Sequence, residues 1–184
     1  MADNTNAMIT TNVANEILKN YFCPREQKTD SKGTVTQTAR SIYVGLGLNT
    51  SNLNKNTTEF IEPWSLCGVD ENGNATNGYA RVNIAEMDEP EGGQTQNTDI
   101  IFFNETRGDG WGNVAYFGLF TSAAKTATPF FWAKLTDTNG AVTTKQIPGE
   151  DSEGNGYIPI FRAEKLKIAI DREPVEKTTT STTT

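Results

Sequence analysis

The chain has 184 residues, enough for one domain with a full hydrophobic core. Its 16 basic and 23 acidic residues give a formal net charge of −7, and the basic residues form no cluster. A protein that follows nucleic-acid phosphates needs a local excess of positive charge, so we expect no direct contact with nucleic acid. The sequence contains no histidine, which removes the commonest general base and the commonest protein ligand of transition metals.

Membrane insertion and secretion are not expected either. No window approaches the roughly 18 apolar residues of a membrane span. The N-terminus, Met1-Ala2-Asp3-Asn4-Thr5, has neither the basic region nor the apolar stretch of a secretory signal. We therefore expect the chain to be made and kept in a cytoplasm until another component carries it out.

Residues 8–22 carry the one convincing helical pattern. Apolar side chains recur there at three- and four-residue steps, at Val13, Ile17, Leu18 and Tyr21. A polar residue is expected to cap the start of the helix, with three candidates: Thr10, Thr11 and Asn12. The stripe is short, so the helix needs a surface to lie against, either its own β domain or a neighbouring subunit. We take the four stripe residues, together with Trp64, as candidate partner-binding residues.

The chain then passes through two polar stretches on either side of a strand. Residues 25–40 are rich in Lys, Thr, Gln and Asp and are expected to form a linker or arm. Residues 41–48 are predicted to form a strand whose two glycines mark close packing or a bulge. Residues 49–77 form a long polar stretch with a small apolar island around Trp64 and Cys67, and such a loop is either functional or partly structured.

From residue 79 onward the sequence is a series of short β signals. The predicted strands cover residues 79–85, 99–106, 113–120, 130–135, 141–147 and 165–170. Their aromatic residues are expected to belong to the core, namely Trp111, Tyr116, Phe117, Phe120, Phe130, Phe131 and Trp132. Asp137-Thr138-Asn139-Gly140 is predicted to be a hairpin turn, because Asn-Gly supplies the positive φ angles of a tight turn. The last strand alternates strictly between apolar residues and lysines, which predicts one buried and one exposed face.

These elements predict a mainly β fold, an antiparallel β-sandwich or small barrel with one short N-terminal α-helix and polar N- and C-terminal extensions. We divide the chain into an N-terminal helix and arm at residues 1–40, a β domain at residues 41–172 and a Thr-rich tail at residues 173–184. The tail is too polar to bury a core and is expected to be extended or disordered when alone.

No metal, cofactor or catalytic site is predicted. Asp70-Glu71-Asn72-Gly73-Asn74 begins like a calcium loop, but that pattern then requires a glycine at Ala75 and a glutamate at Arg81. Residues 149–156 concentrate three carboxylates and are interpreted as a solvated connection between strands. The acidic residues form no catalytic pair that we can identify, and Arg107-Gly108-Asp109 is interpreted as a turn.

Four further residues have two interpretations each. Cys23 and Cys67 are interpreted as small apolar residues of the core, and a disulfide between them is the alternative. For Arg81 and Lys134, an ion pair within the sheet and a contact with a partner are both open, and a local pairing is favoured for Arg81.

The N-terminal helix is followed by segments whose order and spacing form a pattern. They are Ile42-Tyr43-Val44-Gly45-Leu46, Gly78-Tyr79-Ala80-Arg81-Val82, Trp111-Gly112-Asn113-Val114-Ala115-Tyr116-Phe117-Gly118-Leu119-Phe120, Phe131-Trp132-Ala133-Lys134-Leu135 and Ala163-Glu164-Lys165-Leu166-Lys167-Ile168-Ala169-Ile170. In this pattern, over about residues 10–171, the chain resembles small tailed-bacteriophage virion structural proteins, known as tail fibre-like, head fibre or capsid decoration proteins. Such proteins typically have a glycine directly before the closing Lys-Leu, where this chain has Glu164.

The resemblance implies a structural role on the phage particle and carries no catalytic residues. We expect a virion protein, made in the bacterial host cytoplasm and attached to the capsid exterior or neck through its helix, arm and sheet edges. Its expected partners are the major capsid, neck or tail protein and copies of itself, with a trimer as the first form to consider. The alternative is a tail-associated adhesion module that binds a host surface glycan or protein with the loops at residues 49–77 and 149–156. An enzyme is not expected.

Overall fold

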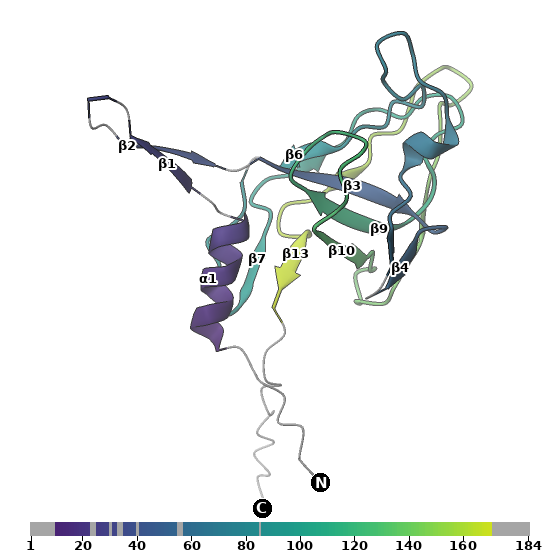
Figure 1. Ribbon diagram of the computed structural model, residues 1–184. Helices are drawn as coiled ribbons and strands as arrows, with labels where there is room; N and C mark the ends of the chain where they lie inside the picture. The colour runs from purple at the N-terminus through teal and green to yellow at the C-terminus, as the bar shows by residue number, and fades with distance from the viewer. Residues whose placement is uncertain are drawn as a thin grey trace, which may run out of the picture.

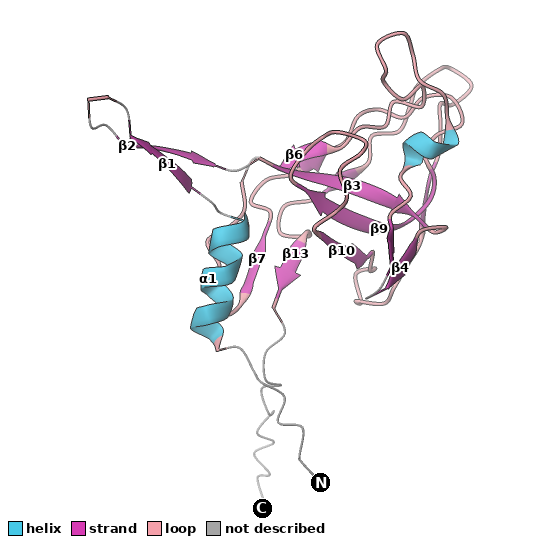
Figure 2. Ribbon diagram, viewed as in Figure 1, coloured by secondary structure: helices cyan, strands magenta, loops and turns pink. Residues whose placement is uncertain are grey.

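The computed structural model describes residues 10–22, 25–29, 31–32, 35–39, 41–54, 57–84 and 86–170. The protein is mainly β, with one α-helix near the N-terminus, and every described strand pair is antiparallel, as predicted (Figures 1 and 2). The predicted Thr-rich tail and Cys23 lie outside the described residues.

The elements are short and follow one another closely along the chain. The helices are α1 (Thr11–Phe22) and the 3-10 helix η1 (Pro63–Leu66). The strands are β1 (Arg25–Thr29), β2 (Val35–Ala39), β3 (Ile42–Leu48), β4 (Asn52–Asn54), β5 (Thr57–Glu59), β6 (Val82–Ile84), β7 (Gln94–Gln96), β8 (Ile101–Phe102), β9 (Gly112–Phe120), β10 (Phe131–Lys134), β11 (Lys145–Ile147), β12 (Ile160–Phe161) and β13 (Lys167–Ala169). No described helix is long and apolar enough to cross a membrane.

A five-stranded sheet forms the centre of the molecule. Its order is β10-β9-β3-β6, and β11 continues beside β10 along the same edge of β9. Strands β3 and β9 are buried along most of their length, which is why their sequences read as nearly continuous apolar runs with glycines. The remaining strands form four two-stranded ribbons: β1–β2, β4–β5, β8–β12 and β7–β13.

The two glycines of β3 mark close packing, as predicted. A Cβ atom on Gly45 would lie 2.6 Å from Oε1 of Glu62. One on Gly47 would lie 2.8 Å from the ring of Phe60. Glycine at both positions therefore lets the segment around η1 lie directly on the sheet.

Helix α1 packs against its own chain, the first of the two surfaces considered for it. Thr10 is the cap, since its Oγ1 accepts a hydrogen bond from the backbone N–H of Val13 at 3.4 Å. The helix lies beside β7 in Figure 1, and Oδ1 of Asn15 accepts a hydrogen bond from the Gly93 N–H at 2.6 Å. Leu18 is 1% exposed and belongs to the main hydrophobic core, where it anchors the helix.

Two polar stretches contain more regular structure than a linker or plain loop. Residues 25–40, predicted as a linker or arm, contain the β1–β2 hairpin, which projects away from the body of the molecule in Figure 1. The sequence analysis did not predict strands here, yet this polar segment forms a complete antiparallel backbone ladder. Residues 49–77 contain β4, β5 and η1, so this stretch is partly structured.

Each of the six strands predicted from residue 79 onward overlaps an observed strand. Leu166 and Ile168 are buried and Lys165 and Lys167 are exposed, as the alternation predicts. The turn before β11 is also confirmed, since the Asp137 N–H bonds to the Ala141 carbonyl at 2.8 Å. Of its Asn-Gly pair only Gly140 has a positive φ, so the turn is not the type with two left-handed residues. Strands β7 and β12 were not predicted, because one is polar and the other has two residues.

The core is rich in aromatic residues, but not all of the seven predicted there belong to it. Tyr116 and Trp132 are half-buried and contact each other edge to face, outside the main core. Trp111 and Phe120 are fully buried, and Trp111 makes edge-to-face contacts with Tyr79 and Phe103. Phe130 was predicted in the core but is 42% exposed, where it contacts Phe22 of α1. It lies just before β10, where the chain enters the sheet at its edge and one side of the ring is left open.

Candidate functional site

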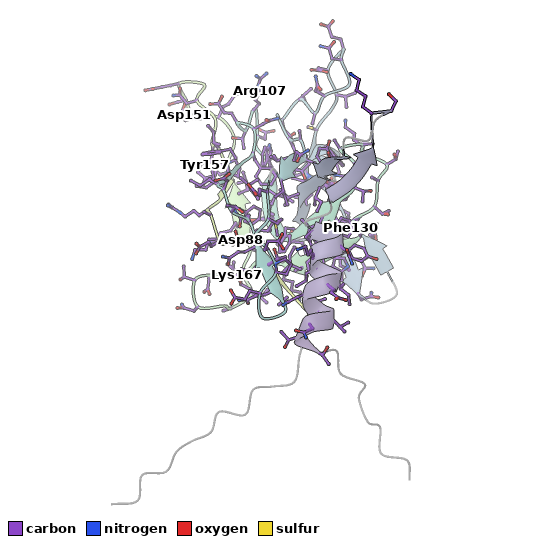
Figure 3. All side chains as sticks on the ribbon, turned by 90° about the vertical axis from the view of Figure 1, so that its left-hand side faces the viewer. Asp88, Arg107, Phe130, Asp151, Tyr157 and Lys167 are labelled. Atoms are coloured by element: carbon purple, nitrogen blue, oxygen red, sulfur yellow. The ribbon has the colours of Figure 1, made fainter. Side chains whose placement is uncertain are left out.

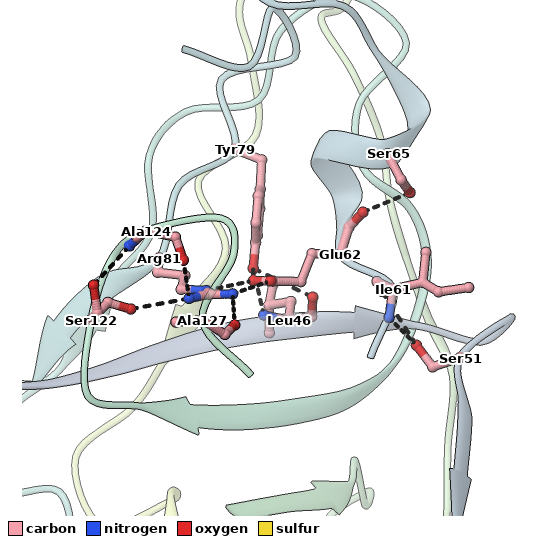
Figure 4. Close-up of polar contacts among 10 residues, drawn as sticks. All are labelled: Leu46, Ser51, Ile61, Glu62, Ser65, Tyr79, Arg81, Ser122, Ala124 and Ala127. Carbon is pink, nitrogen blue, oxygen red and sulfur yellow. Dashed lines mark hydrogen bonds and ion pairs between the residues drawn. The ribbon is translucent and has the colours of Figure 1, made fainter. Parts of the chain in front are cut away.

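A buried ion pair lies above the central sheet. Nη2 of Arg81 is 2.6 Å from Oε2 of Glu62, and Nε of Arg81 is 3.0 Å from Oε1, so the two groups meet in a bidentate geometry (Figure 4). The side chains are only 1% and 3% exposed. The local pairing favoured for Arg81 is therefore observed, and its partner comes from the segment that precedes η1. Lys134, for which two interpretations were open, has an exposed side chain.

Arg81 uses all five of its N–H donors. Besides the two bonds to Glu62, it donates to three backbone carbonyls in the loop after β9, those of Ser122, Ala124 and Ala127, at 2.8–3.0 Å. Its guanidinium carbon also lies 3.4 Å from the ring centroid of Phe120 and 4.9 Å from that of Trp64. One side chain thus holds the η1 segment, the loop after β9 and the sheet together.

Tyr79 completes this cluster. Its hydroxyl donates to Oε1 of Glu62 at 2.8 Å and accepts the backbone N–H of Leu46 at 2.8 Å (Figure 4). Burial and the neighbouring Glu62 carboxylate raise the pKa of the Tyr79 hydroxyl well above its usual value. Burial also raises the pKa of Glu62, against the opposing effect of its bonds to Arg81 and Tyr79. Every polar atom of the cluster has a partner within the protein, so its chemistry is that of a structural support.

An open groove of about 860 Å³ lies over this cluster. Tyr79 and Arg81 form part of its floor, and Trp64 of η1 lies beside them. Its walls come from three segments that are far apart in the sequence: residues 70–78, residues 104–107 and residues 123–125. Of these walls, Arg81 holds the one at residues 123–125 directly, through its bond to the Ala124 carbonyl.

The wall formed by residues 70–78 is stiffened by its own hydrogen bonds. The Asp70 carboxylate accepts the backbone N–H groups of Asn72 and Asn74 at 2.9 and 2.8 Å and the Asn74 side-chain amide at 3.1 Å. These bonds, that of the Asn74 side chain first, lower the pKa of Asp70. Across the groove, Nζ of Lys125 donates to the Gly73 carbonyl at 3.1 Å and lies 5.8 Å from the Trp64 ring centroid.

The acidic loop at residues 150–156 is organised in the same way. The Asp151 carboxylate accepts the backbone N–H groups of Glu153 and Asn155, both at 2.9 Å, and these bonds lower its pKa. Among the described residues, no three side chains of the types that bind metals lie close enough to hold an ion. Cys67 is a free thiol packed beside the core. Residues 107–110 form a turn, with the Gly110 N–H bonded to the Arg107 carbonyl at 3.0 Å.

The five candidate partner-binding residues do not form one surface. On α1, Val13 and Tyr21 are 45% and 52% exposed, Ile17 is half-buried, and Leu18 is buried in the protein's own core. Trp64 lies in the groove, on a different element. Of the residues around the groove, Glu62, Asn74 and Lys125 were missed, because no local pattern marks a residue whose partners lie elsewhere in the chain.

The outer face of the β8–β12 ribbon is a second surface of interest. Phe102 and Ile160 are directly paired across the two strands, and their side chains are 59% and 40% exposed. Ile100 and Ile158 lie two residues away on the same face and are 44% and 50% exposed. Four exposed large apolar side chains thus lie along this ribbon, and we call them the apolar patch.

The comparisons with known proteins place the chain among phage fibre proteins, a class of virion structural component, as the resemblance predicted. The matching family is described as podophage GP4 fiber I protein gp80, and the match covers residues 38–148, more than half of the chain. The chain belongs to this family. No curated protein matches the sequence. The buried ion pair and the groove both lie within the matched residues.

Proposed function

We propose that this fibre protein is attached to the capsid exterior or the neck as a decoration or head-fibre component, where it meets the major capsid, neck or tail protein. Membership of a phage fibre family carries the proposal. Three features support attachment through extended segments. The β1–β2 hairpin projects from the body, α1 exposes Val13 and Tyr21, and no described strand pairs with the outer edge of β6. Backbone edges and projecting hairpins readily pair with a neighbouring chain.

Purified virions provide the test. Mass spectrometry of density-purified particles is expected to find the chain, and immunogold labelling is expected to mark the head surface or the neck. Complete absence of the chain from purified particles refutes the proposal. Label confined to the distal end of the tail refutes the attachment site while leaving the virion location in place.

We further propose that the protein forms a homo-oligomer, with a trimer as the expected form. The apolar patch of β8 and β12 supports this, because covering four exposed large apolar side chains with a second copy removes them from water. Light scattering coupled to size-exclusion chromatography measures the mass directly. A monomer at all accessible concentrations contradicts this part of the proposal.

A second candidate function is adhesion to a host surface glycan or protein. The observation that favours it is the groove over the Arg81 cluster, which is built from loops on a rigid sheet in the manner of many recognition sites. The predicted tip at residues 49–77 contributes to that groove through Trp64 and residues 70–76. Binding of the fluorescently labelled protein to host cells tests this role, and no binding at high micromolar concentration counts against it.

We also propose that the protein is not an enzyme. The sequence has no histidine, and the buried Glu62 and Tyr79 are committed to bonds within the protein. A turbidity assay on host envelopes is expected to show no clearing, and reproducible lysis by the purified protein overturns this proposal.

A further inference from the structure

We propose that the groove over the Arg81 cluster binds a neutral saccharide unit of the host surface. This inference rests on the adhesion role proposed above and names its site and its ligand class. The groove volume of about 860 Å³ lies within the range of small-ligand sites. The argument for a sugar comes from three properties of the lining residues: their hydrogen-bonding groups, their charge and their rigidity.

The lining combines one large aromatic ring with many polar groups. Trp64 is half-buried, so part of the indole is open to the groove. An indole in a polar site can pack against the C–H face of a sugar ring while polar neighbours bind the hydroxyls. The amides of Asn74 and Asn104 and the charged ends of Arg107 and Lys125 supply those neighbours. A sugar hydroxyl both donates and accepts, and the groove offers partners of both kinds.

The same lining disfavours an apolar ligand. Apart from Trp64 and the buried Tyr79, its apolar side chains are alanines, at positions 75, 80, 123 and 124. A peptide that binds through hydrophobic anchors needs apolar pockets, and alanine side chains are too small to form them. The lining therefore favours a ligand that combines hydrogen bonds with stacking on the Trp64 ring.

The charges of the lining favour a neutral ligand. Asp70 and Glu105 carry two negative charges, Arg107 and Lys125 carry two positive charges, and Arg81 is neutralised by Glu62. Asp70 and Glu105 already accept hydrogen bonds from loop backbone, whereas the Arg107 side chain is exposed and has no hydrogen-bond or ion-pair partner among the described residues. Arg107 is therefore the cation most available to donate to a ligand hydroxyl.

The groove is preorganised. Its floor is held by the five bonds of Arg81, and the wall at residues 70–78 is held by the Asp70 carboxylate. Lys125 closes the rim by its bond to the Gly73 carbonyl. A rigid site loses little conformational entropy when a ligand binds, which matters for a ligand that is itself strongly hydrated.

The test uses the full chain, with tryptophan fluorescence and saturation-transfer NMR as the measurements. The probes are glucose, galactose, N-acetylglucosamine and rhamnose, each to about 10 mM because single sugar units bind weakly, with glucuronate as the charged comparison. At least one neutral sugar is expected to bind. Arg107→Ala is expected to weaken it roughly tenfold, the usual effect of losing one charge-assisted hydrogen bond.

Lys167→Ala is the matched control. Lys167 is also an exposed cation, and Figure 3 shows it toward the opposite end of the molecule from Arg107. Its substitution is expected to leave sugar binding unchanged. Ala123→Trp serves as a second variant, because Ala123 is exposed on the rim and a large side chain there fills the groove without altering the core. Thermal melts of all three variants verify that they fold.

The outcomes separate this inference from the adhesion role. If the wild-type protein binds host cells but no neutral sugar, the groove assignment is wrong and the adhesion role stands. The same conclusion follows if Arg107→Ala and Ala123→Trp bind sugar as the wild type does. If it binds neither cells nor sugars, both are wrong. Tighter binding of glucuronate than of any neutral sugar overturns the neutral ligand class.

Discussion

Removing the charge of Glu62 is expected to destabilise the protein strongly. Glu62→Gln keeps the shape of the side chain but leaves the Arg81 guanidinium buried without its counter-ion. Breaking a buried ion pair in this way typically costs about 3–5 kcal/mol. Because both side chains are almost fully buried, solvent screening gives little reduction. The burial that raises the pKa of Glu62 offsets part of the benefit of its charge, so we place the expected loss at the lower end, about 3 kcal/mol, or a melting temperature lower by roughly 10 °C.

Urea denaturation at neutral pH, followed by tryptophan fluorescence, measures this loss. Trp64 lies 4.9 Å from the Arg81 guanidinium, so its emission also reports on the cluster itself. The matched control is Lys19→Met, which breaks the ion pair of Lys19 with Glu89 on the surface. Those side chains are 58% and 59% exposed, so the control is expected to cost less than about 1 kcal/mol.

A double substitution tests whether the cost comes from the unpaired charge. Glu62→Met combined with Arg81→Met removes both charges, so its loss is expected to be smaller than the sum of the two single losses. The reasoning is refuted if Glu62→Gln costs no more than the Lys19 control. It is also refuted if the losses of the two methionine variants add without coupling, since residues in one buried network must interact.

Three further predictions concern a strained residue, the apolar patch and the groove wall. Glu164 has a φ of 61°, in the left-handed region that favours glycine, so Glu164→Gly is expected to stabilise the protein by about 0.5–1 kcal/mol in urea denaturation; a loss of stability contradicts this. Phe102 of the apolar patch is 59% exposed, so Phe102→Ser is expected to dissociate the proposed oligomer in light scattering while changing the folding free energy by less than about 1 kcal/mol. An unchanged mass excludes this patch as the interface. The pKa of Asp70 in the folded protein lies below its ordinary value of 3.8. The ionised Asp70 carboxylate therefore stabilises the fold above pH 3.8, and this stability is lost as the pH falls through the pKa of the folded protein. Asn74→Ala removes the first cause of the shift, so NMR titration is expected to show the Asp70 pKa rising toward 3.8, and an unaltered pKa contradicts the assignment.

Glu164 has a strained backbone at a position where the sequence comparison led us to expect glycine. Related phage proteins were expected to have glycine directly before the closing Lys-Leu, and Glu164 is the one non-glycine residue with a positive φ among the described residues. Its backbone N–H still bonds to the Asn97 carbonyl at 2.9 Å. The fold therefore imposes the left-handed conformation at this point, and the strain is tolerated because the surrounding strands are held independently.

The sequence by itself determined the features that depend on near neighbours in the chain. The alternation of the last strand, the glycines of β3 and the presence of one N-terminal helix with a polar residue at its start are local patterns of hydrophobicity, size and hydrogen bonding. They predict a mainly antiparallel β protein with one helix, which the structure confirms, and the order of segments identifies a phage structural protein. Local patterns suffice here because backbone geometry fixes which side chains share a face.

Only the tertiary structure decided which residues meet in the buried ion pair and in the groove. The partner of Arg81 is 19 residues away, and the groove is lined by separate segments between Trp64 and Lys125, so no sequence spacing marks them. The helix stripe shows the same limit, because packing against β7 buries Leu18 and leaves Val13 and Tyr21 exposed. Burial and ion pairing depend on which elements meet in space, and that is set by the packing of the whole core.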